Sequence, residues 1–419
     1  MGNDPVTTTC CIAGGGPAGI MLGLLLSRAG IGVAVLEKHA DFFRDFRGDT
    51  LHPSTLELMH ELGMLEDLLK LPHTKYRTLA GRFGKRTITV ADFSHLPTRC
   101  KFIALMPQWD FLNFLTEKAR AYPGFKLFME HDVRELIRQD GRIAGAIANS
   151  PRGRVKIRAD LTVGADGRHS AVRQQAGLEV IDLGAPIDVL WMRISRRPDD
   201  PAQGLGNLQA GRVLVLLPRG DYFQCGMVIP KGSADEIKQK GLPAFQALVA
   251  EIVPFLSDRV HELDNWEKIK LLSVQINRLR KWSMPGLLCI GDAAHAMSPI
   301  GGVGINLAIQ DAVAAANILA APLKERCVTE DILQRVQKRR EWPVRVTQRA
   351  QVFIQNRLFG AAARKRTNPN PVPFLLRWLP GSMRQRLAAR VVGMGVRPEH
   401  IELQQALSTK SEIRNKFKI

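Results

Sequence analysis

An acidic residue and a glycine-rich turn lie close together late in the chain, in a pattern that could bind an anion or an electron-rich ring. The segment Gly291-Asp292-Ala293-Ala294-His295 leads through Pro299 to a turn at 301–306. It follows an apolar run, 287–290, that predicts a short buried strand, and it precedes a stretch, 307–319, that predicts a helix. Glycines at such a helix start let backbone N–H groups approach a ligand closely. Any tight strand-to-helix turn could share this pattern, so its meaning depends on the rest of the chain.

A second glycine turn, near the start of the chain, has the order of a dinucleotide-binding unit. It consists of a β-rich run at 7–13, Gly14, Gly16 and Gly19 in GxGxxG spacing, Pro17 at the expected helix start, an apolar stretch at 18–29, Gly30 as a C-cap, and a strand at 33–36 that ends in Glu37, 18 residues after Gly19. Proline suits the first helical turn, and glycine suits the position after the last one. In such a βαβ unit the helix N-terminus faces a pyrophosphate and the acid accepts hydrogen bonds from a ribose.

A third segment, Gly164-Ala165-Asp166-Gly167, follows a predicted strand at 161–163. Alone it is an ordinary Asp-Gly turn. The three segments in this order resemble the FAD-dependent aromatic hydroxylase family, the single-component flavoprotein monooxygenases of the para-hydroxybenzoate hydroxylase and ubiquinone-pathway hydroxylase type. The stretch from Arg47 to Pro53 resembles the family's arginine-led segment, and Gln108 opens a segment that matches its glutamine-led helix. The resemblance covers about residues 8 to 355.

This resemblance implies cofactor contacts for individual residues. They are Gly14, Gly15, Gly16, Pro17, Ala18 and Gly19 at the FAD pyrophosphate; Glu37 and Lys38 at the adenosine ribose; Arg47 at a flavin phosphate or in steering the reductant; Gln108 at the ribityl chain; Val133 at adenine; Asp166 and Gly167 in a segment serving FAD and nicotinamide nucleotide; Asp292 at a ribityl hydroxyl; and Pro299, Gly301, Gly302, Val303, Gly304, Ile305 and Asn306 at the isoalloxazine edge. Lys38 could equally be an exposed lysine, and Val133 could equally be a buried strand valine; the lesser alternative for Arg47 is a surface arginine. Val303 stands where many relatives have glutamine. His295 is interpreted as structural.

The implied fold is a Rossmann-like α/β FAD-binding domain with an inserted, mostly antiparallel β-sheet domain and a C-terminal helical tail. The expected divisions are 1–75, 108–180 and 283–355 for the discontinuous FAD domain, 76–107 and 181–282 for the substrate-binding sheet, and 356–419 for a basic extension. Strand-like runs at 189–194, 212–217, 223–229 and 270–276 support the sheet, with a helix at 244–253. Runs at 88–90 and 102–106 are expected to add strands to it.

The same resemblance implies the reaction. NAD(P)H would reduce bound FAD, and the reduced flavin would react with O2 to form a C4a-hydroperoxyflavin that hydroxylates an aromatic, quinone-like or polyketide substrate. A dry pocket would protect that species, and a base would help by deprotonating a phenol. Tyr222, Gln224, Arg193 and His52 are candidates for the base, but each is more readily explained as a structural residue, so no catalytic residue is assigned.

Other activities fit the same motifs. A flavin halogenase would carry a WxWxIP segment, and the tryptophan-containing segments at 191–194 and 266–269 do not match it. A reductase of prenyl-chain substrates would add hydrogen without oxygen. A non-catalytic FAD-bearing partner protein would have damaged flavin motifs, and those of this chain are intact.

Composition limits the remaining choices. The 419 residues are 45% hydrophobic and 24% charged, as in ordinary globular proteins. Six cysteines without CxxC spacing favour a reduced, cytoplasmic location. No metal site, signal peptide or transmembrane helix is expected. The net charge is +19, and residues 361–419 hold twelve basic and three acidic residues. The amphipathic stretch 383–392 could contact the inner, anionic face of a membrane or pack on the body as an ordinary helix. Nucleic-acid binding is not expected, since no recognition motif accompanies the charge.

Overall fold

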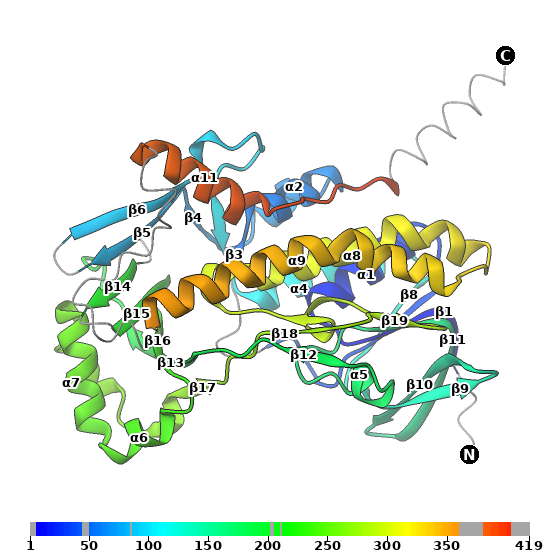
Figure 1. Cartoon of the computed structure of the whole chain (residues 1–419), viewed down its shortest axis with the longest axis horizontal. Coiled ribbons are helices and arrows are strands. Elements are labelled where there is room, and N and C mark those ends of the chain that lie inside the picture. Colours follow the sequence, from blue (N-terminus) through cyan, green and yellow to red (C-terminus); the bar gives the residue numbers. More distant parts are fainter. Residues whose placement is uncertain are drawn as a thin grey trace.

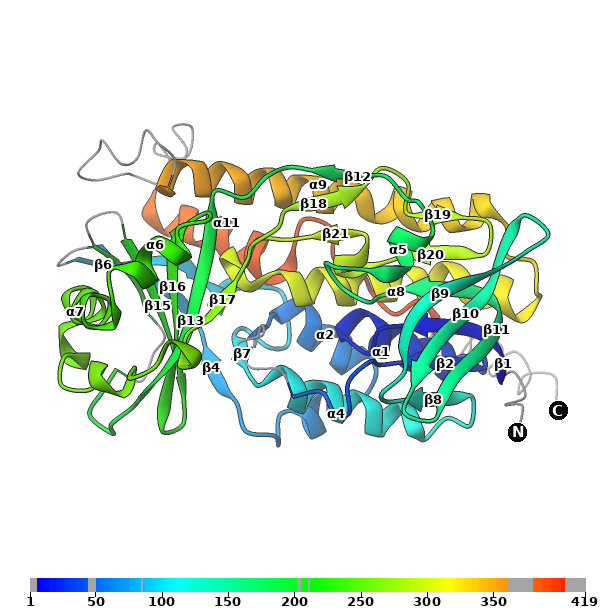
Figure 2. The same ribbon diagram turned by 90° about the horizontal axis from the view of Figure 1, so that it is seen from below.

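The computed structural model describes residues 6–43, 50–83, 86–201, 205–209, 212–359 and 380–403. Two sheets lie at opposite ends of the long axis, and two long helices, α8 (Gly304–Lys324) and α9 (Glu330–Phe359), run along that axis (Figures 1 and 2). Mixed α/β architecture with an inserted antiparallel sheet is the fold class that the sequence predicts, and it is confirmed.

The first sheet has a parallel core in the order β20-β11-β1-β2-β8. Its strands are β1 (Val6–Ala13), β2 (Val33–Leu36), β8 (Phe125–Phe128), β11 (Gly153–Gly164) and β20 (Leu287–Cys289), with β9 (Asp132–Gln139), β10 (Arg142–Ser150) and β19 (Ser283–Met284) added in antiparallel fashion. Ala13 pairs with Leu36 and with Gly164, and Gly164 pairs with Cys289. The carboxyl ends of four strands are therefore level, which is where ligands bind in open parallel sheets.

Helix α1 (Pro17–Arg28) packs against α8 on this sheet. Proline occupies its first turn, and Gly30 ends it with φ +83° and an N–H bonded to the Ser27 carbonyl at 2.9 Å, as predicted. Helix α8 is longer than the predicted 307–319. Among the described residues, the helical stretch 300–324 is long and apolar enough to cross a membrane, but 72% of its most apolar window is buried inside the protein, as in a core helix.

The second sheet has seven strands in the order β17-β13-β16-β15-β14-β5-β6. They are β5 (Thr78–Phe83), β6 (Arg86–Asp92), β13 (Ile187–Ser195), β14 (Leu205–Gln209), β15 (Arg212–Arg219), β16 (Tyr222–Pro230) and β17 (Lys270–Leu272). All neighbours are antiparallel except β14 and β5. Helices α6 (Ala234–Gln239) and α7 (Leu242–Ile252) belong to the cluster that covers one face, where Leu190, Phe223 and Phe245 form a buried core.

One predicted strand of that sheet is wrong, and another is shorter than predicted. Residues 102–106 do not join it, because β7 (Ile103–Leu105) pairs with β3 (Thr50–Leu51) and β4 (Thr74–Tyr76) in a separate sheet. The run 270–276 stops at Leu272, because the Val274 N–H donates to the buried Asp188 carboxylate at 2.9 Å and its carbonyl accepts from Lys231. The chain then forms β18 (Asn277–Leu279) with β12 (Val180–Asp182) and β21 (His295–Ala296).

The other α-helices within the described residues are α2 (Pro53–Glu61), α3 (Leu65–Leu68), α4 (Gln108–Arg120), α5 (Ala171–Gln175) and α11 (Gly381–Met394). Helix α11 contains the predicted amphipathic stretch and packs on β6. A Cβ atom at Gly393 would lie 2.8 Å from the Leu96 side chain, so the helix and the body are in close contact. Its other face exposes Met383, Leu387 and Val391.

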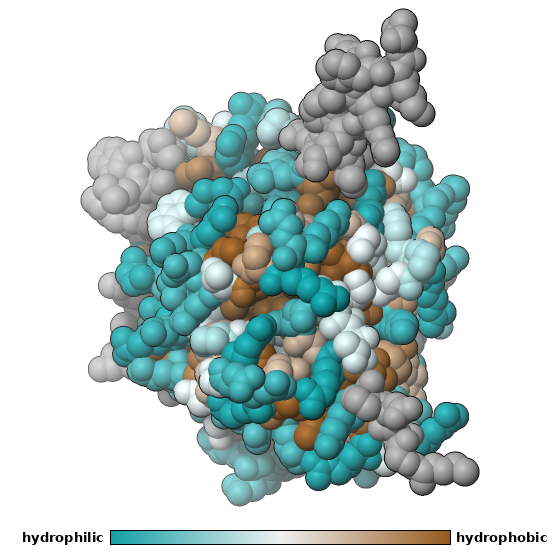
Figure 3. All heavy atoms as spheres, turned by 90° about the vertical axis from the view of Figure 1, so that its right-hand side faces the viewer, coloured by the Kyte–Doolittle hydropathy of each residue, from teal (hydrophilic) through white to brown (hydrophobic). Residues whose placement is uncertain are grey.

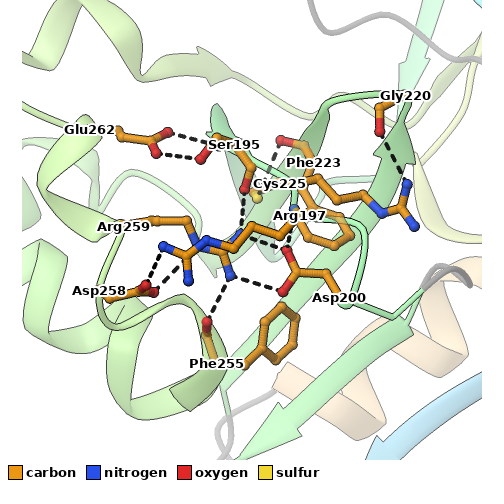
Figure 4. A network of polar contacts seen from close by, with 11 residues as sticks. Ser195, Arg197, Asp200, Gly220, Phe223, Cys225, Phe255, Asp258, Arg259 and Glu262 are labelled. Atoms are coloured by element: carbon orange, nitrogen blue, oxygen red, sulfur yellow. Dashed lines mark hydrogen bonds and ion pairs between the residues drawn. The ribbon is translucent and has the colours of Figure 1, made fainter.

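A polar network fastens the loop after β13 to the segment that follows α7 (Figure 4). Arg259, whose side chain is 5% exposed, donates to both carboxylate oxygens of Asp200 at 2.5 and 2.9 Å and to the carbonyls of Ser195 and Phe255. Glu262 accepts hydrogen bonds from the N–H and hydroxyl of Ser195. At the opposite end of the molecule, hydrophilic side chains cover most of the visible surface (Figure 3).

Candidate functional site

The glycine turn after β1 is shaped for a close backbone approach. Gly14 has φ +103°, and a Cβ there would lie 2.4 Å from the carbonyl oxygen of residue 165. A Cβ at Gly19 would lie 1.9 Å from the Gly14 carbonyl, whereas one at Gly16 would meet nothing within 4 Å. Gly16 is also the N-cap of α1, without any side-chain cap, and Pro17 has no N–H, so the N–H groups of Ala18 and Gly19 are the ones at this helix start that no side chain caps. The turn therefore leaves open space in front of a helix N-terminus, as a pyrophosphate requires.

Glu37 holds this turn from the end of β2. Its buried carboxylate accepts hydrogen bonds from the N–H of Gly15 at 2.9 Å and of His39 at 3.1 Å. A carboxylate at the end of β2 is an acceptor of the kind that a ribose hydroxyl binds in a dinucleotide site. Lys38 is exposed beside it.

The Asp-Gly and Gly-Asp segments meet at a buried arginine, Arg173. Its guanidinium donates to the Ala293 carbonyl at 3.4 Å and to the Arg168 carbonyl, and it lies in the electrostatic field of both Asp166 and Asp292. One oxygen of Asp166 accepts from the Val172 N–H at 3.1 Å, and the other is buried without a hydrogen-bond partner. Burial raises the pKa of Asp166, although neighbouring hydrogen bonds oppose the shift. A buried acceptor at the ends of the strands is an atom that a ligand hydroxyl would satisfy.

The turn 299–304 connects β21 to α8. Gly301 and Gly302 have φ values of +82° and +62°, and a Cβ at Gly302 would lie 2.5 Å from the Thr50 hydroxyl. Gly304 begins α8 without a side-chain cap, and a Cβ there would meet nothing within 4 Å. Pro299, Val303 and Ile305 are half-buried around this open N-terminus.

The side chain of Asn306 is bonded to neighbouring parts of the protein. Its side-chain oxygen accepts from the His52 N–H at 3.0 Å and the Thr55 hydroxyl at 2.6 Å, and its amide group donates to the carbonyls of Thr50 and Gly302. The side chain thus ties the turn to the start of α2. Only its backbone N–H, in the first turn of α8, faces the helix N-terminus.

Three buried glutamines on α9 hold the turn and the residues that lead into it, and the sequence analysis did not identify them. Gln351 bonds the backbone of Ser298 and Ile300, Gln348 bonds the carbonyls of Asn277 and Ala296, and Gln355 bonds the Ser298 hydroxyl. Their spacing of three and four residues, in a helix otherwise rich in arginine, is the signal that could have found them.

The other predicted contacts are placed less tightly. Gln108 is half-buried at the start of α4, close to β7, and the Val133 side chain is buried in β9 as the strand-valine alternative expects. Arg47 lies outside the described residues. The structure brings the segments of Gly14, Glu37, Asp166 and Asp292 to one edge of the sheet. An adenosine ribose, a pyrophosphate and a polyol chain all find donors or acceptors there, so the residues fit FAD.

None of the four candidate bases gains an acid–base role from its surroundings. His52 is fully buried, and burial lowers its pKa to about 4 although its Nδ1 atom bonds the Val392 carbonyl at 2.7 Å. Arg193 lies 5.0 Å from the centre of the Tyr222 ring on the second sheet, and Gln224 is buried beside Arg193 in the neighbouring strand.

Comparisons with known proteins agree with this geometry. The sequence profile of the FAD binding domain matches residues 7–350. The chain is 33% identical over 367 residues to 6-methylpretetramide 4-monooxygenase of Streptomyces rimosus, covering 86% of each protein. It is 26% identical to para-nitrophenol 4-monooxygenase of Pseudomonas sp. (strain WBC-3), covering 77% of this chain and 80% of that protein. Its fold is similar to that of the anhydrotetracycline hydroxylase of Streptomyces rimosus, with a TM-score of 0.72, 22% identity, and coverage of 94% and 77%.

The fold and the site define an FAD-dependent oxidoreductase of the monooxygenase type. The chain belongs to the FAD-dependent aromatic hydroxylase family, as its motif order predicts.

Proposed function

We propose that this protein hydroxylates a polycyclic aromatic ring of polyketide type, with NAD(P)H as reductant and O2 as the source of oxygen. The observation that carries the proposal is the similarity to 6-methylpretetramide 4-monooxygenase along 86% of both chains. Bound FAD would supply the redox and oxygen chemistry, and the protein would bind, orient and exclude water. The residues assigned to FAD are those that the sequence predicts, with Asn306 acting through its backbone and the site of Arg47 undescribed.

The substrate domain of this proposal is the second sheet. Trp191 and Val228 lie on one face of β13 and β16. They belong to the same apolar cluster as Ile300 of the turn 299–304, which we call the flavin turn. Trp191 pairs with Gly226, where a Cβ would lie 2.9 Å from the indole ring, so this glycine lets the ring lie over the neighbouring strand. An apolar, aromatic wall beside the flavin turn suits a planar ring system.

Arg193 stands on the same face of β13, two residues beyond Trp191, and is exposed. A guanidinium beside an aromatic wall favours a substrate whose hydroxyl groups are acidic, because it stabilises the phenolate or enolate form. Phenolates are also the better nucleophiles for hydroxylation. The arrangement therefore favours acidic, multiply hydroxylated rings.

The test is product analysis with purified, yellow holoenzyme. Phenols, quinones and polycyclic polyketides are screened for stimulated NAD(P)H oxidation, and the product mass is measured. A gain of one oxygen atom supports the proposal. A gain of hydrogen alone would indicate a reductase, and a gain of halogen would indicate a halogenase. No turnover with any substrate would indicate a non-catalytic partner protein. Each of these three results would contradict hydroxylation.

We also propose a cytoplasmic protein that touches an anionic membrane surface through α11. Met383, Leu387 and Val391 recur every four residues on its outer face, Arg386 and Arg390 are exposed beside them, and the helix contains no acidic residue. Apolar side chains next to arginines are typical of interfacial helices. Such contact would bring the enzyme close to lipophilic substrates.

A further inference from the structure

The C-terminal segment 381–403 lies beyond the region that the FAD-binding profile matches. It is nevertheless connected by hydrogen bonds to two loops of the flavin site, 291–295 and 302–306. Helix α11 packs on β6 and α2, and the chain that follows it runs beside α2 toward α8 (Figure 1). His400 and the Ile401 N–H bond Glu61 of α2, and Asn317 of α8 bonds the backbone of His400 and Glu402. The segment is thus bonded to the body rather than only lying against it.

The first connection to the flavin site runs through His52. The Val392 carbonyl accepts a hydrogen bond from His52 Nδ1 at 2.7 Å. A carbonyl can only accept, so the Nδ1 atom carries the proton. The backbone N–H of His52 donates to the Asn306 side chain at 3.0 Å, and Asn306 in turn donates to the Gly302 carbonyl. A buried chain of bonds therefore links the end of α11 to the turn 302–306.

The second connection runs through four charged side chains. Glu399 accepts from Arg339 at 2.8 Å and from Arg340 at 3.0 Å, and Arg340 donates to Asp311 at 3.0 Å. Asp311 accepts from the Gly291 N–H at 3.0 Å and contacts His295 Nε2 at 2.5 Å. Asp311 and Arg340 are fully buried, and Glu399 nearly so.

Asp292 stands between the two groups that Asp311 holds, Gly291 and His295. The orientation of Asp292 therefore depends on Asp311. Asp311 is in turn held by the guanidinium of Arg340, and the other carboxylate that pairs with this guanidinium is Glu399. Two carboxylates face two guanidiniums in this network. Removing Glu399 would leave the buried Arg340 with one carboxylate partner, Asp311, beside the Arg397 carbonyl, and would change the electrostatic field at the loop, because charges interact strongly inside a protein.

We propose that Val392 and Glu399 position the flavin: through His52 and Arg340 they hold the turn 302–306 and the loop 291–295 in the geometry that binds FAD. Neither residue touches the reacting atoms. Because coupling between two sites is reciprocal, bound FAD also holds the C-terminal segment against the body.

The test compares Glu399→Ala with Glu402→Ala, an exposed neighbour, in the full-length holoenzyme. We expect Glu399→Ala to release FAD on dilution with a dissociation constant about tenfold higher, and to shift the visible spectrum of the flavin that stays bound. Glu402→Ala should match the wild type in both. A Glu399→Ala protein with wild-type FAD affinity and spectrum would overturn the proposal, even if its melting temperature were lower, because a purely structural role predicts that result.

A second pair of variants keeps the test open if Glu399→Ala does not fold. His52→Asn places an amide N–H near the position of Nδ1 and should keep most of the FAD affinity, whereas His52→Leu cannot donate to Val392 and should lose it. Equal FAD affinity in the wild type and both His52 variants would reject the connection through α11.

Discussion

Asp166 and Asp292 lie 126 positions apart in the chain but in the field of one buried guanidinium, that of Arg173. This contact explains how two acids can be held near one edge of a sheet without mutual repulsion. One buried carboxylate oxygen of Asp166 has no hydrogen-bond partner. At the residue scale, the site is a set of acceptors held ready for hydroxyl donors.

Asp292→Ala tests the acceptor that we assign to the ribityl chain. Loss of a hydrogen bond to a charged group costs about 1.5–3 kcal/mol, so FAD should dissociate about ten to a hundred times more readily. Flavin fluorescence during dialysis measures the loss. Tyr222→Phe is the control and should retain FAD, and equal retention by the two variants would remove Asp292 from the site.

Arg193→Gln tests the proposal that Arg193, beside the aromatic wall of the second sheet, binds an acidic substrate. Loss of the guanidinium should raise KM for an acidic polyphenol about tenfold and leave FAD bound, because Arg193 lies on the second sheet and no FAD contact is assigned to it. Steady-state kinetics with an acidic ring and its O-methylated analogue provide the readout. An unchanged ratio of kcat/KM between the two substrates would contradict the assignment.

The ion pair between Asp200 and Arg259 makes part of the stability of the fold depend on pH. The hydrogen bond from Arg259 holds the pKa of Asp200 below its ordinary value. The pair therefore stabilises the fold above the unfolded-state pKa of about 3.9, and this stability is lost as pH falls through the lower folded value. Asp200→Asn should destabilise the protein by about 3 kcal/mol at neutral pH, and the deficit should shrink in acid. Urea unfolding of the exposed-neighbour variant Asp199→Asn should match the wild type, and a deficit independent of pH would refute the argument.

Elements far apart in the sequence combine to hold the flavin turn. Helix α9 supplies glutamines, α8 supplies its N-terminus and Asn306, and β3 supplies the Thr50 hydroxyl, which bonds the Gly302 carbonyl at 3.0 Å. The turn contains glycines that are free to take many conformations when unfolded. The surrounding elements therefore select the one that leaves the start of α8 open.

Gln351→Leu tests that selection at the element scale. It leaves the Ser298 N–H and the Ile300 carbonyl buried without this partner, which should cost about 2 kcal/mol of stability and weaken FAD binding. Asn356→Ala, an exposed change on the same helix, is the control. Thermal melts with and without added FAD separate the loss of stability from the loss of FAD binding. If added FAD fully restores the melting temperature, the substitution has loosened the flavin turn. An unchanged FAD affinity would argue against a role of Gln351 in holding that turn.

Helices α8 and α9 run along the axis between the two sheets, which lie at opposite ends of the molecule (Figure 2). Ile300 of the turn 299–304 packs in an apolar cluster with residues of the second sheet. The C-terminal segment closes over α2 and β6 on the outside. Helix α11 therefore has two faces with different roles. Its inner face contacts the rest of the protein, and its outer face carries apolar and basic side chains.

Sedimentation with vesicles tests the outer face. Wild-type protein should sediment with anionic phosphatidylglycerol vesicles and be released by salt, because each basic residue near such a surface contributes about 1 kcal/mol. A Leu387→Ser, Val391→Ser variant should stay in the supernatant while retaining FAD. If both proteins remain soluble with anionic vesicles, α11 has no membrane role.

The local sequence by itself determined the βαβ unit, the three glycine-bearing turns and the cofactor class. Strand and helix periodicity, prolines at helix starts and glycines with positive φ act within a few residues, so their spacing is readable. Only the tertiary structure decided which polar partners meet: β7 with β3, Asn306 with His52, the α9 glutamines with the turn, and Glu399 with Arg340. A buried hydrogen-bond donor or acceptor pairs with whatever the folded chain brings within about 3 Å, and no sequence period encodes that encounter.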